Sequence, residues 1–214
     1  LAMGPLNARL ANELQSAWAN HLVVAVEPSN TIGMSLRFIP PGEFIMGSSP
    51  SEDRRESDEG PQHRVRLTRP FYLSVTEVTH WQWFEVLGTR PWLGKESARL
   101  GDNFPTTFVN WNDAVQFCKK LTELEGVVYR LPTEAEWEYS CRAGNETARY
   151  FGNDLTPLNE HAWWGGASRI GSIQGEKYPH IVGTRKPNAF GLFDMYGNVY
   201  EWCQDSYEPS AYGT

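Results

Sequence analysis

The sequence contains no long apolar run, few cysteines and no excess of positive charge. Its longest uninterrupted apolar stretch, residues 22–26, is far shorter than the roughly 20 residues of a membrane-spanning helix. Three cysteines in 214 residues are too few for a disulfide-dense secreted scaffold, and an odd number leaves at least one thiol unpaired within the chain. With 26 acidic and 19 basic residues the net charge is -7, which argues against a polybasic nucleic-acid-binding module. We therefore expect a soluble domain of ordinary size whose partner is a protein or peptide rather than nucleic acid or membrane.

Several catalytic signatures are absent as well. There is no G-x-x-x-x-G-K-[ST] phosphate loop, no G-x-S-x-G nucleophile elbow, and no H-E-x-x-H or H-x-x-x-H pair among the five histidines. These absences exclude the commonest local signatures of nucleotide hydrolysis, of serine hydrolysis and of helix-borne zinc or iron sites, while a site built from distant histidines stays open. No secretory signal is visible at the amino end, so we expect a cytoplasmic location.

Aromatic residues, by contrast, are abundant. The chain has 9 Trp, 9 Tyr and 10 Phe, while charged residues make up an ordinary 21%. Many large rings at low mean hydropathy predict a loop-rich domain held together by aromatic anchors.

The amino-terminal segment has the periodicity of a helix. Apolar residues recur at every fourth position, which places them on one helix face: Leu6, Leu10, Leu14, Trp18 and Leu22. We expect residues 1–30 to form a helix and connector, and residues 31–214 to form the main domain. The helix either packs on its own domain or docks an appended upstream domain.

The following segment changes to short strands and capped helices. Residues 36–39 and 44–46 flank Pro40-Pro41-Gly42, which predicts a hairpin, and the acidic residues 48–62 predict a solvated loop. Capping boxes predict helices after Thr79, with Gln82, and after Thr133, with Glu136. A further helix is expected after Asn112, because the Trp-Asn-Asp sequence at 111–113 is explained by helix capping without calcium.

Residues 191–202 suggest a different chemistry. Asp194 and Glu201 supply two carboxylates, and the glycine and asparagine between them allow the backbone to turn and expose carbonyl oxygens. Hard oxygen donors in an irregular arrangement suit Ca²⁺. Composition alone makes this a weak signal, because an acidic turn residue is usually solvated.

Five ordered blocks resemble the signature segments of the formylglycine-generating-enzyme family, also called sulfatase-modifying-factor domains. They are IPPGEFIMG at 39–47, FYLSVTEVT at 71–79, VNWNDA at 109–114, RLPTEAEWEY at 130–139 and GNVYEW at 197–202. The resemblance implies an α+β, coil-rich variant of the C-type lectin fold. It also implies an oxidase that converts a sulfatase cysteine to formylglycine with O₂ and copper.

The copper ligands of that family are two closely spaced cysteines in a carboxy-terminal segment. No such pair occurs in this sequence, and the expectation is that this domain lacks its C-terminal segment. Cys118 and Cys141 resemble positions that some relatives link to that tail, and Cys203 resembles neither copper ligand. A copper site would therefore depend on a missing segment, and the sequence predicts no catalytic residue of its own.

The family's calcium site is carried over more completely. Its ligands correspond to the side chains of Asp194 and Glu201 and to the backbone carbonyls of Gly197 and Val199. A second calcium site near His161 lacks its expected asparagine and is not predicted. Tyr200 stands where the family usually has tryptophan.

Three functions remain open. The favoured hypothesis is a formylglycine-generating-enzyme-like binding or regulatory module, because scaffold blocks are retained without the cysteine pair. The alternatives are a C-terminally incomplete copper-dependent oxidase and a lectin-like ligand-display protein. The related sulfoxide synthases are disfavoured, because residues 1–38 contain no H-x-x-x-H-x-E motif.

Overall fold

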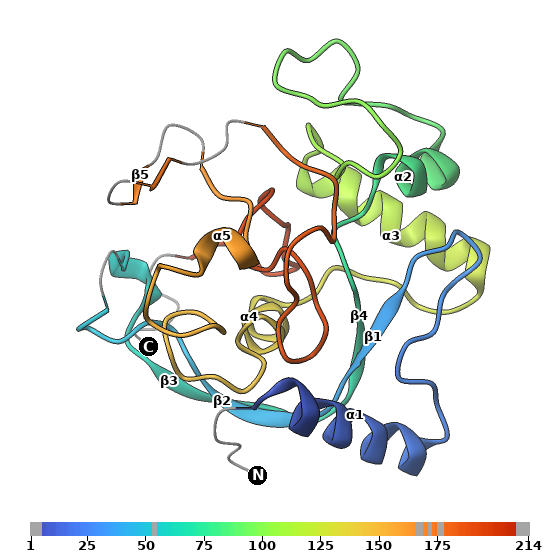
Figure 1. The fold of residues 1–214 in the computed structure, drawn as a ribbon. Helices are drawn as coiled ribbons and strands as arrows, with labels where there is room; N and C mark the ends of the chain where they lie inside the picture. The colour runs from blue at the N-terminus through green and yellow to red at the C-terminus, as the bar shows by residue number, and fades with distance from the viewer. Residues whose placement is uncertain (1–5, 53–54, 166–168, 171–172, 175–177, 209–214) are drawn as a thin grey trace.

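The computed structural model describes residues 6–52, 55–165, 169–170, 173–174 and 178–208 (Figure 1). The helices are α1 (Ala8–Leu22), the 3₁₀ helix η1 (Ser57–Glu59), α2 (His80–Leu87), α3 (Trp111–Glu125), α4 (Glu134–Arg142) and α5 (Leu158–His161). The strands are β1 (Leu36–Ile39), β2 (Gly42–Met46), β3 (His63–Leu67), β4 (Phe71–Ser74), β5 (Arg169–Ile170) and β6 (Ile173–Gln174). The fold is thus a mixed α/β arrangement with few short strands and much structured coil, as the sequence predicted.

The strands form antiparallel pairs that the sequence did not predict. β1 pairs with β4, with Leu36 opposite Ser74, and β2 pairs with β3, with Gly42 opposite Leu67. The predicted hairpin of β1 with β2 is therefore wrong. Pro40 and Pro41 have no N–H to donate across a hairpin, and they instead carry the chain from one strand pair into the other.

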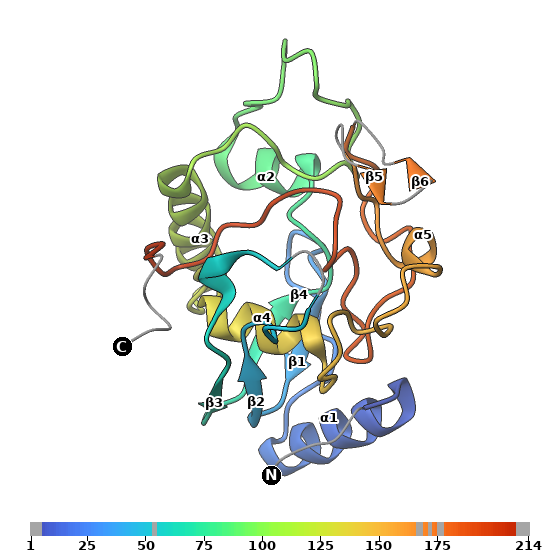
Figure 2. The same ribbon diagram turned by 90° about the vertical axis from the view of Figure 1, so that its left-hand side faces the viewer.

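Helix α1 is confirmed, but its buried face is not the predicted one. The residues that face the core are Ala11, Gln15 and Ala19, whereas Leu10 and Leu22 remain 39% and 41% exposed. Gln15 explains the rotation, because its side-chain amide donates hydrogen bonds to the Phe38 carbonyl at 2.7 Å and to the Phe190 carbonyl at 3.3 Å. The small alanines on either side let the helix approach β1 closely (Figure 2).

The predicted capping boxes are present in α2 and α4. Thr79 with Gln82, and Thr133 with Glu136, each exchange both side-chain-to-backbone hydrogen bonds. Helix α3 has the same arrangement, but its N-cap is Asn110 with Asp113, so the helix begins two residues earlier than expected. Each such cap stabilises its helix by about 1 kcal/mol.

Glu136 of α4 is also the partner of an arginine. Both Nη atoms of Arg130 lie 2.6 Å from its carboxylate oxygens, and the Thr133 N–H donates to the same carboxylate. Burial raises the pKa of Glu136, but these hydrogen bonds and the Arg130 charge outweigh burial and leave the pKa below its usual value.

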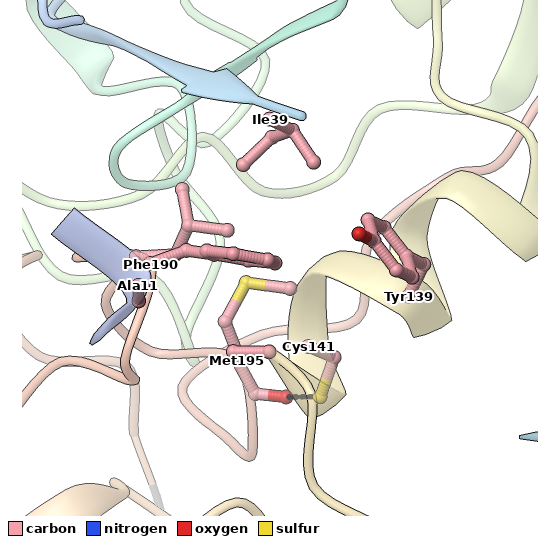
Figure 3. Close-up of a cluster of buried hydrophobic side chains, with 8 residues drawn as sticks. Ala11, Ile39, Tyr139, Cys141, Phe190 and Met195 are labelled. Carbon is pink, nitrogen blue, oxygen red and sulfur yellow. Dashed lines mark hydrogen bonds between the residues drawn. The ribbon is translucent and has the colours of Figure 1, made fainter. Parts of the chain in front are cut away.

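Two groups of buried side chains form the core. The first joins α1, β1, α4 and the segment 188–195, and Figure 3 shows Ala11, Ile39, Tyr139, Cys141, Phe190 and Met195 from this group. The second lies around α2 and α3 and consists of Ile32, Met34, Trp83, Val86, Trp92, Phe117 and Leu121. The rings of Trp83 and Phe117 stack with centroids 5.3 Å apart. Aromatic side chains are therefore structural anchors, as the composition suggested.

A partly buried ion pair holds the end of β2 against α4. Arg142 Nε lies 2.7 Å from Glu138 Oε1, which also accepts the Gly47 N–H, and Arg142 Nη2 donates to the Gly47 carbonyl. Gly47 has φ +89°, and a Cβ there would lie 2.5 Å from the Glu59 carbonyl oxygen. Only glycine satisfies both constraints without displacement of the backbone.

The segment predicted as a solvated loop is more structured than expected. In its described part, Ser48 is buried and η1 forms a short turn, while residues 53–54 lie outside the described residues. Across the part of the chain that is described, no helix combines the length and the apolar character needed to cross a membrane.

Candidate functional site

The segment that contains the predicted calcium ligands is fixed to α4 by one buried asparagine. Asn188 donates to the carbonyls of Ser140 at 2.7 Å and Cys141 at 3.2 Å. Its side-chain oxygen accepts the N–H groups of Phe190 and Leu192. These four hydrogen bonds determine where the following residues, 194–201, lie.

Asp194 begins the predicted ligand loop in a left-handed conformation. Its φ is 58°, the residue is only 1% exposed, and its Oδ2 accepts the Gly183 N–H at 2.6 Å. No described residue donates a hydrogen bond to its other carboxylate oxygen, Oδ1. Burial raises the pKa of Asp194, although the Gly183 N–H, the neighbouring Glu77 carboxyl group and the Arg185 charge oppose this effect. An unpaired buried carboxylate oxygen is costly, so Oδ1 is a strong candidate to bind a cation.

The turn that follows is tightly enclosed. The Gly197 N–H donates to the Asp194 carbonyl at 3.0 Å, and a Cβ at Gly197 would overlap the Trp163 carbonyl. Asn198, also left-handed with φ 65°, donates its N–H to that same Trp163 carbonyl. Its side chain accepts the His180 N–H at 2.8 Å and donates to the His180 carbonyl at 3.2 Å. Three separate segments thus determine the shape of the loop.

Glu201 completes the predicted set from the other end of the loop. Its Oε2 accepts the indole N–H of Trp137, at 3.1 Å. The residue is exposed to solvent, and Trp137 covers one side of its carboxyl group. Burial raises the pKa of Glu201 to about 7, the Asp194 charge adds to this rise, and the Trp137 hydrogen bond opposes it.

A third carboxylate, Glu77, was missed by the sequence reasoning. It lies just beyond β4, is 8% exposed, and neither of its carboxylate oxygens meets a hydrogen-bond donor among the described residues. Burial, followed by the Asp194 and Glu201 charges, raises the pKa of Glu77 well above its usual value; its own backbone N–H and the nearby Asn198 amide, which does not reach hydrogen-bond geometry, oppose the rise. In the sequence, Glu77 could be noticed only as an acidic residue within the β-rich block 71–79.

The site therefore brings three carboxyl groups together, and two of them, Glu77 and Asp194, have oxygens without a hydrogen-bond donor among the described residues. Within the described residues, no three His, Cys, Asp or Glu side chains are close enough together to hold a metal ion alone. Ligation at this loop would therefore require backbone oxygens as well, and Gly197 and Val199 are the residues from which the sequence predicted them.

The residues on either side of Glu201 present aromatic side chains to solvent. Tyr200 is fully exposed and Trp202 is 48% exposed. The Trp202 indole N–H donates to the Val109 carbonyl, and the Trp111 indole N–H donates to the Cys203 carbonyl. The Asp205 carboxylate accepts the Glu134 N–H at the start of α4. This exposed segment is thus held against the amino ends of α3 and α4.

The three cysteines are separate, free thiols. Cys141 is buried in the first core group and donates its S–H to the Met195 carbonyl (Figure 3). Burial raises the pKa of Cys118 to about 11, and the pKa values of Cys141 and Cys203 to about 12. All three thiols are therefore less acidic than an exposed cysteine.

Near His161, where no second calcium site was predicted, the side chains form aromatic stacks. The His161 ring stacks on Phe151 with centroids 4.7 Å apart, and the Trp163 ring lies 3.6 Å from that of His180. The Arg185 guanidinium lies 3.4 Å from the Trp163 centroid. The His180 ring and the Arg185 guanidinium are both so close to Trp163 that they must cover opposite faces of its indole. Trp163 is therefore a rigid support for the Gly197 turn.

Known proteins match this chain over most of its length. The sulfatase-modifying factor enzyme 1-like domain matches residues 25–214. The formylglycine-generating enzyme of Streptomyces coelicolor is 31% identical over an alignment of 249 positions, which covers 88% of this chain and 73% of that protein. The inactive C-alpha-formylglycine-generating enzyme 2 of Bos taurus is 34% identical over 108 residues, which cover 49% of this chain and 34% of that protein.

A solved structure agrees with these matches. The structure of PvdO from Pseudomonas aeruginosa superimposes with a TM-score of 0.71 at 32% identity, covering 86% of this chain and 75% of that one. The matched region holds the strand pairs, helices α2 to α4 and the loop 194–201, while α1 precedes it. The chain belongs to the sulfatase-modifying factor enzyme 1-like family, the family of the formylglycine-generating enzymes.

Proposed function

We propose that this formylglycine-generating-enzyme-like domain is a protein-binding or regulatory module whose recognition loop, residues 194–201, is ordered by a calcium ion. The observation that carries the proposal is the set of buried carboxylate oxygens without donors, on Glu77 and Asp194, in the same region as the exposed Tyr200 and Trp202. A cation would neutralise the carboxylates of Glu77 and Asp194. The exposed rings of Tyr200 and Trp202 would contact the partner.

The donor set suits calcium in its chemistry. Asp194, Glu201 and Glu77 offer carboxylate oxygens, and Gly197 and Val199 offer carbonyl oxygens. Calcium accepts six to eight such ligands in irregular geometry. The ion would stabilise the charged forms of three carboxyl groups whose pKa values are raised in its absence. Its role would be to fix the loop, so no chemical step passes through it.

The thiols in this sequence support the proposal of a non-catalytic role. Copper-dependent oxidation in this family is expected to need a pair of closely spaced cysteines, whereas Cys118, Cys141 and Cys203 are separate free thiols. The similarity to a relative named inactive supports this choice. The three free thiols also favour a reducing compartment such as the cytoplasm.

Two alternatives keep specific support. Similarity to the Streptomyces coelicolor formylglycine-generating enzyme across 88% of the chain favours an oxidase whose copper ligands come from outside this sequence. The coil-rich arrangement of short strands favours a C-type lectin variant of the fold, and with it a lectin-like ligand-display role.

Calcium binding is tested by thermal unfolding with Ca²⁺ and with chelator. A ligand at 100 times its Kd stabilises a folded protein by about 2.7 kcal/mol. For a chain of this size that corresponds to a rise in Tm of roughly 5–10 °C. Glu201→Ala and Glu77→Gln should remove this rise, whereas Glu96→Gln, an exposed acidic residue away from the loop, should retain it. Equal Tm values with Ca²⁺ and with chelator in the unmutated protein would exclude the calcium site.

Partner binding and catalysis are separated with a synthetic peptide that carries the cysteine segment of a sulfatase. We expect fluorescence polarisation to report peptide binding that Tyr200→Ala weakens, without conversion of the cysteine when copper and O₂ are added. Mass-spectrometric detection of formylglycine in the peptide would refute the non-catalytic role and establish the oxidase. Binding of glycans, but not of peptide, would favour the lectin-like role instead.

A further inference from the structure

A concave feature separate from the calcium loop lies beside α2, at the edge of the second core group. A cavity of about 360 Å³ lies between α2 and the loop that follows it, which rises above the rest of the fold (Figures 1 and 2). This volume is within the range of small-molecule sites. None of the residues assigned to the calcium loop lines the cavity.

Aromatic rings make up much of the cavity wall. The rings of His80 and Trp92 are parallel, with centroids 3.8 Å apart, and Trp92 is only 3% exposed. Trp81, on the next position of α2, is 42% exposed and lines the same cavity. A buried stacked pair in one cavity with an accessible indole favours a flat aromatic ligand.

The polar groups of the cavity are mostly hydrogen-bond acceptors. His80 is 5% exposed, and no described residue forms a hydrogen bond with its Nδ1. Burial lowers the pKa of His80, although the Gly101 and Pro105 carbonyls and the Asp102 charge oppose this, so the ring is neutral at pH 7 and keeps one acceptor nitrogen. Glu85 and Asp102 add two carboxylates.

Among the described residues that line the cavity, Arg90 is the one cation, and it already contacts an aromatic ring. The Arg90 guanidinium lies 3.8 Å from the centroid of the Phe84 ring, which fixes it on one side. The carboxylates of Glu85 and Asp102 outnumber this charge, so a ligand with a positive group is attracted on balance and is kept away from the Arg90 side.

We propose that this cavity binds a protonated aromatic amine, with its ring between Trp81 and the His80–Trp92 pair and its ammonium group toward Glu85 and Asp102. Two sources have this chemistry, a free arylalkylamine and an aromatic residue at the amino terminus of a peptide. The cavity binds the group shared by both.

The charge requirement is tested with the full chain and two probes that share one ring. Tryptamine, titrated by calorimetry and followed by saturation-transfer NMR, should bind saturably, and indole-3-propionate should bind at least tenfold more weakly. Equal affinity for the two probes, or no saturable binding of tryptamine, would overturn the proposal.

The location is tested with three variants. Trp81→Ala should weaken tryptamine binding fivefold or more, because it removes an exposed wall of the cavity. Asp102→Asn should weaken it about two- to fivefold, as expected for a solvent-exposed charge pair. Glu96→Gln is the matched control, because it removes an equal charge from the same loop outside the cavity. Unchanged affinity in both cavity variants, or an equal loss in the control, would refute the site.

The source of the ligand is identified with the peptide Trp-Gly-Gly and its N-acetylated form. Tighter binding of the free peptide than of tryptamine identifies a peptide amino terminus, and the reverse order identifies a small amine. Acetylation should abolish peptide binding, and its failure to do so would overturn the proposed role of the ammonium group.

Discussion

Replacement of Gln15 tests how firmly α1 belongs to the fold. Its side chain is 1% exposed and donates to two carbonyls, one at the end of β1 and one at Phe190 in the segment that leads to the calcium loop. Gln15→Ala removes both donors and leaves two carbonyl oxygens without them. A buried group left unpaired costs about 1–3 kcal/mol, and the shortened side chain adds a small cavity.

The expected loss is therefore about 2–4 kcal/mol in the free energy of unfolding. For a domain of 150–250 residues this lowers the Tm by roughly 5–15 °C. Urea unfolding monitored by tryptophan fluorescence and by circular dichroism measures the difference directly. Gln15→Leu separates the two causes, because it fills the space but still leaves both carbonyls unpaired.

Asn12→Ala is the matched control, because Asn12 is an exposed amide on the same helix. A loss for Gln15→Ala no larger than for Asn12→Ala would refute the reasoning, and α1 would then be a peripheral segment. A loss for Gln15→Leu as small as that of the control would show that packing, rather than hydrogen bonding, holds the helix.

Two further outcomes are expected from local constraints. Gly47→Ala should destabilise the protein by about 2 kcal/mol or more, because Gly47 has a positive φ and lies close to the Glu59 carbonyl. Gly88→Ala is the control and should cost about 1 kcal/mol, because Gly88 has a positive φ but open space around it. Equal losses of the two variants in chemical unfolding would contradict this reasoning. Because the Glu136 pKa is lowered in the folded state, its pairing with Arg130 contributes stability above the unfolded pKa, and this is lost as the pH falls through the folded pKa. The unmutated protein should therefore lose more stability than Glu136→Gln between about pH 5 and pH 3, and parallel pH profiles of Tm would argue against this contribution.

The features that the sequence predicted correctly depend on neighbouring residues. The capping boxes of α2 and α4 involve residues three positions apart, so their hydrogen bonds follow from local geometry. The strand pairs depend on contacts between distant segments, and no local pattern distinguished β4 from β2 as the partner of β1. The division into residues 1–30 and 31–214 stays a prediction.

The buried face of α1 shows a second reason for error. A count of leucines favours the stripe through Leu10 and Leu22, but a buried glutamine with two carbonyl partners and two flanking alanines determines the orientation. Such a polar anchor is recognisable only when both acceptors are known.

The candidate site, too, was predicted from the sequence only in part. Asp194, Gly197, Val199 and Glu201 lie in one continuous segment and were named from a motif, and the structure places Asp194 and Glu201 close enough for their charges to interact. Glu77 joins them from beyond β4, and only the fold reveals that its carboxylate lies near theirs. Their assignment as calcium ligands is a prediction.

The three free thiols can also serve as intrinsic probes of local unfolding. Cys118 lies on α3, Cys141 in the first core group and Cys203 beside the recognition loop, so each samples a different region. Cys141 is buried and Cys118 and Cys203 are half-buried, so local opening of its surroundings should speed the reaction of each thiol with an alkylating reagent. The order in which the three react, read by mass spectrometry without any introduced label, would therefore rank the stabilities of these regions and show which of them a bound ligand closes.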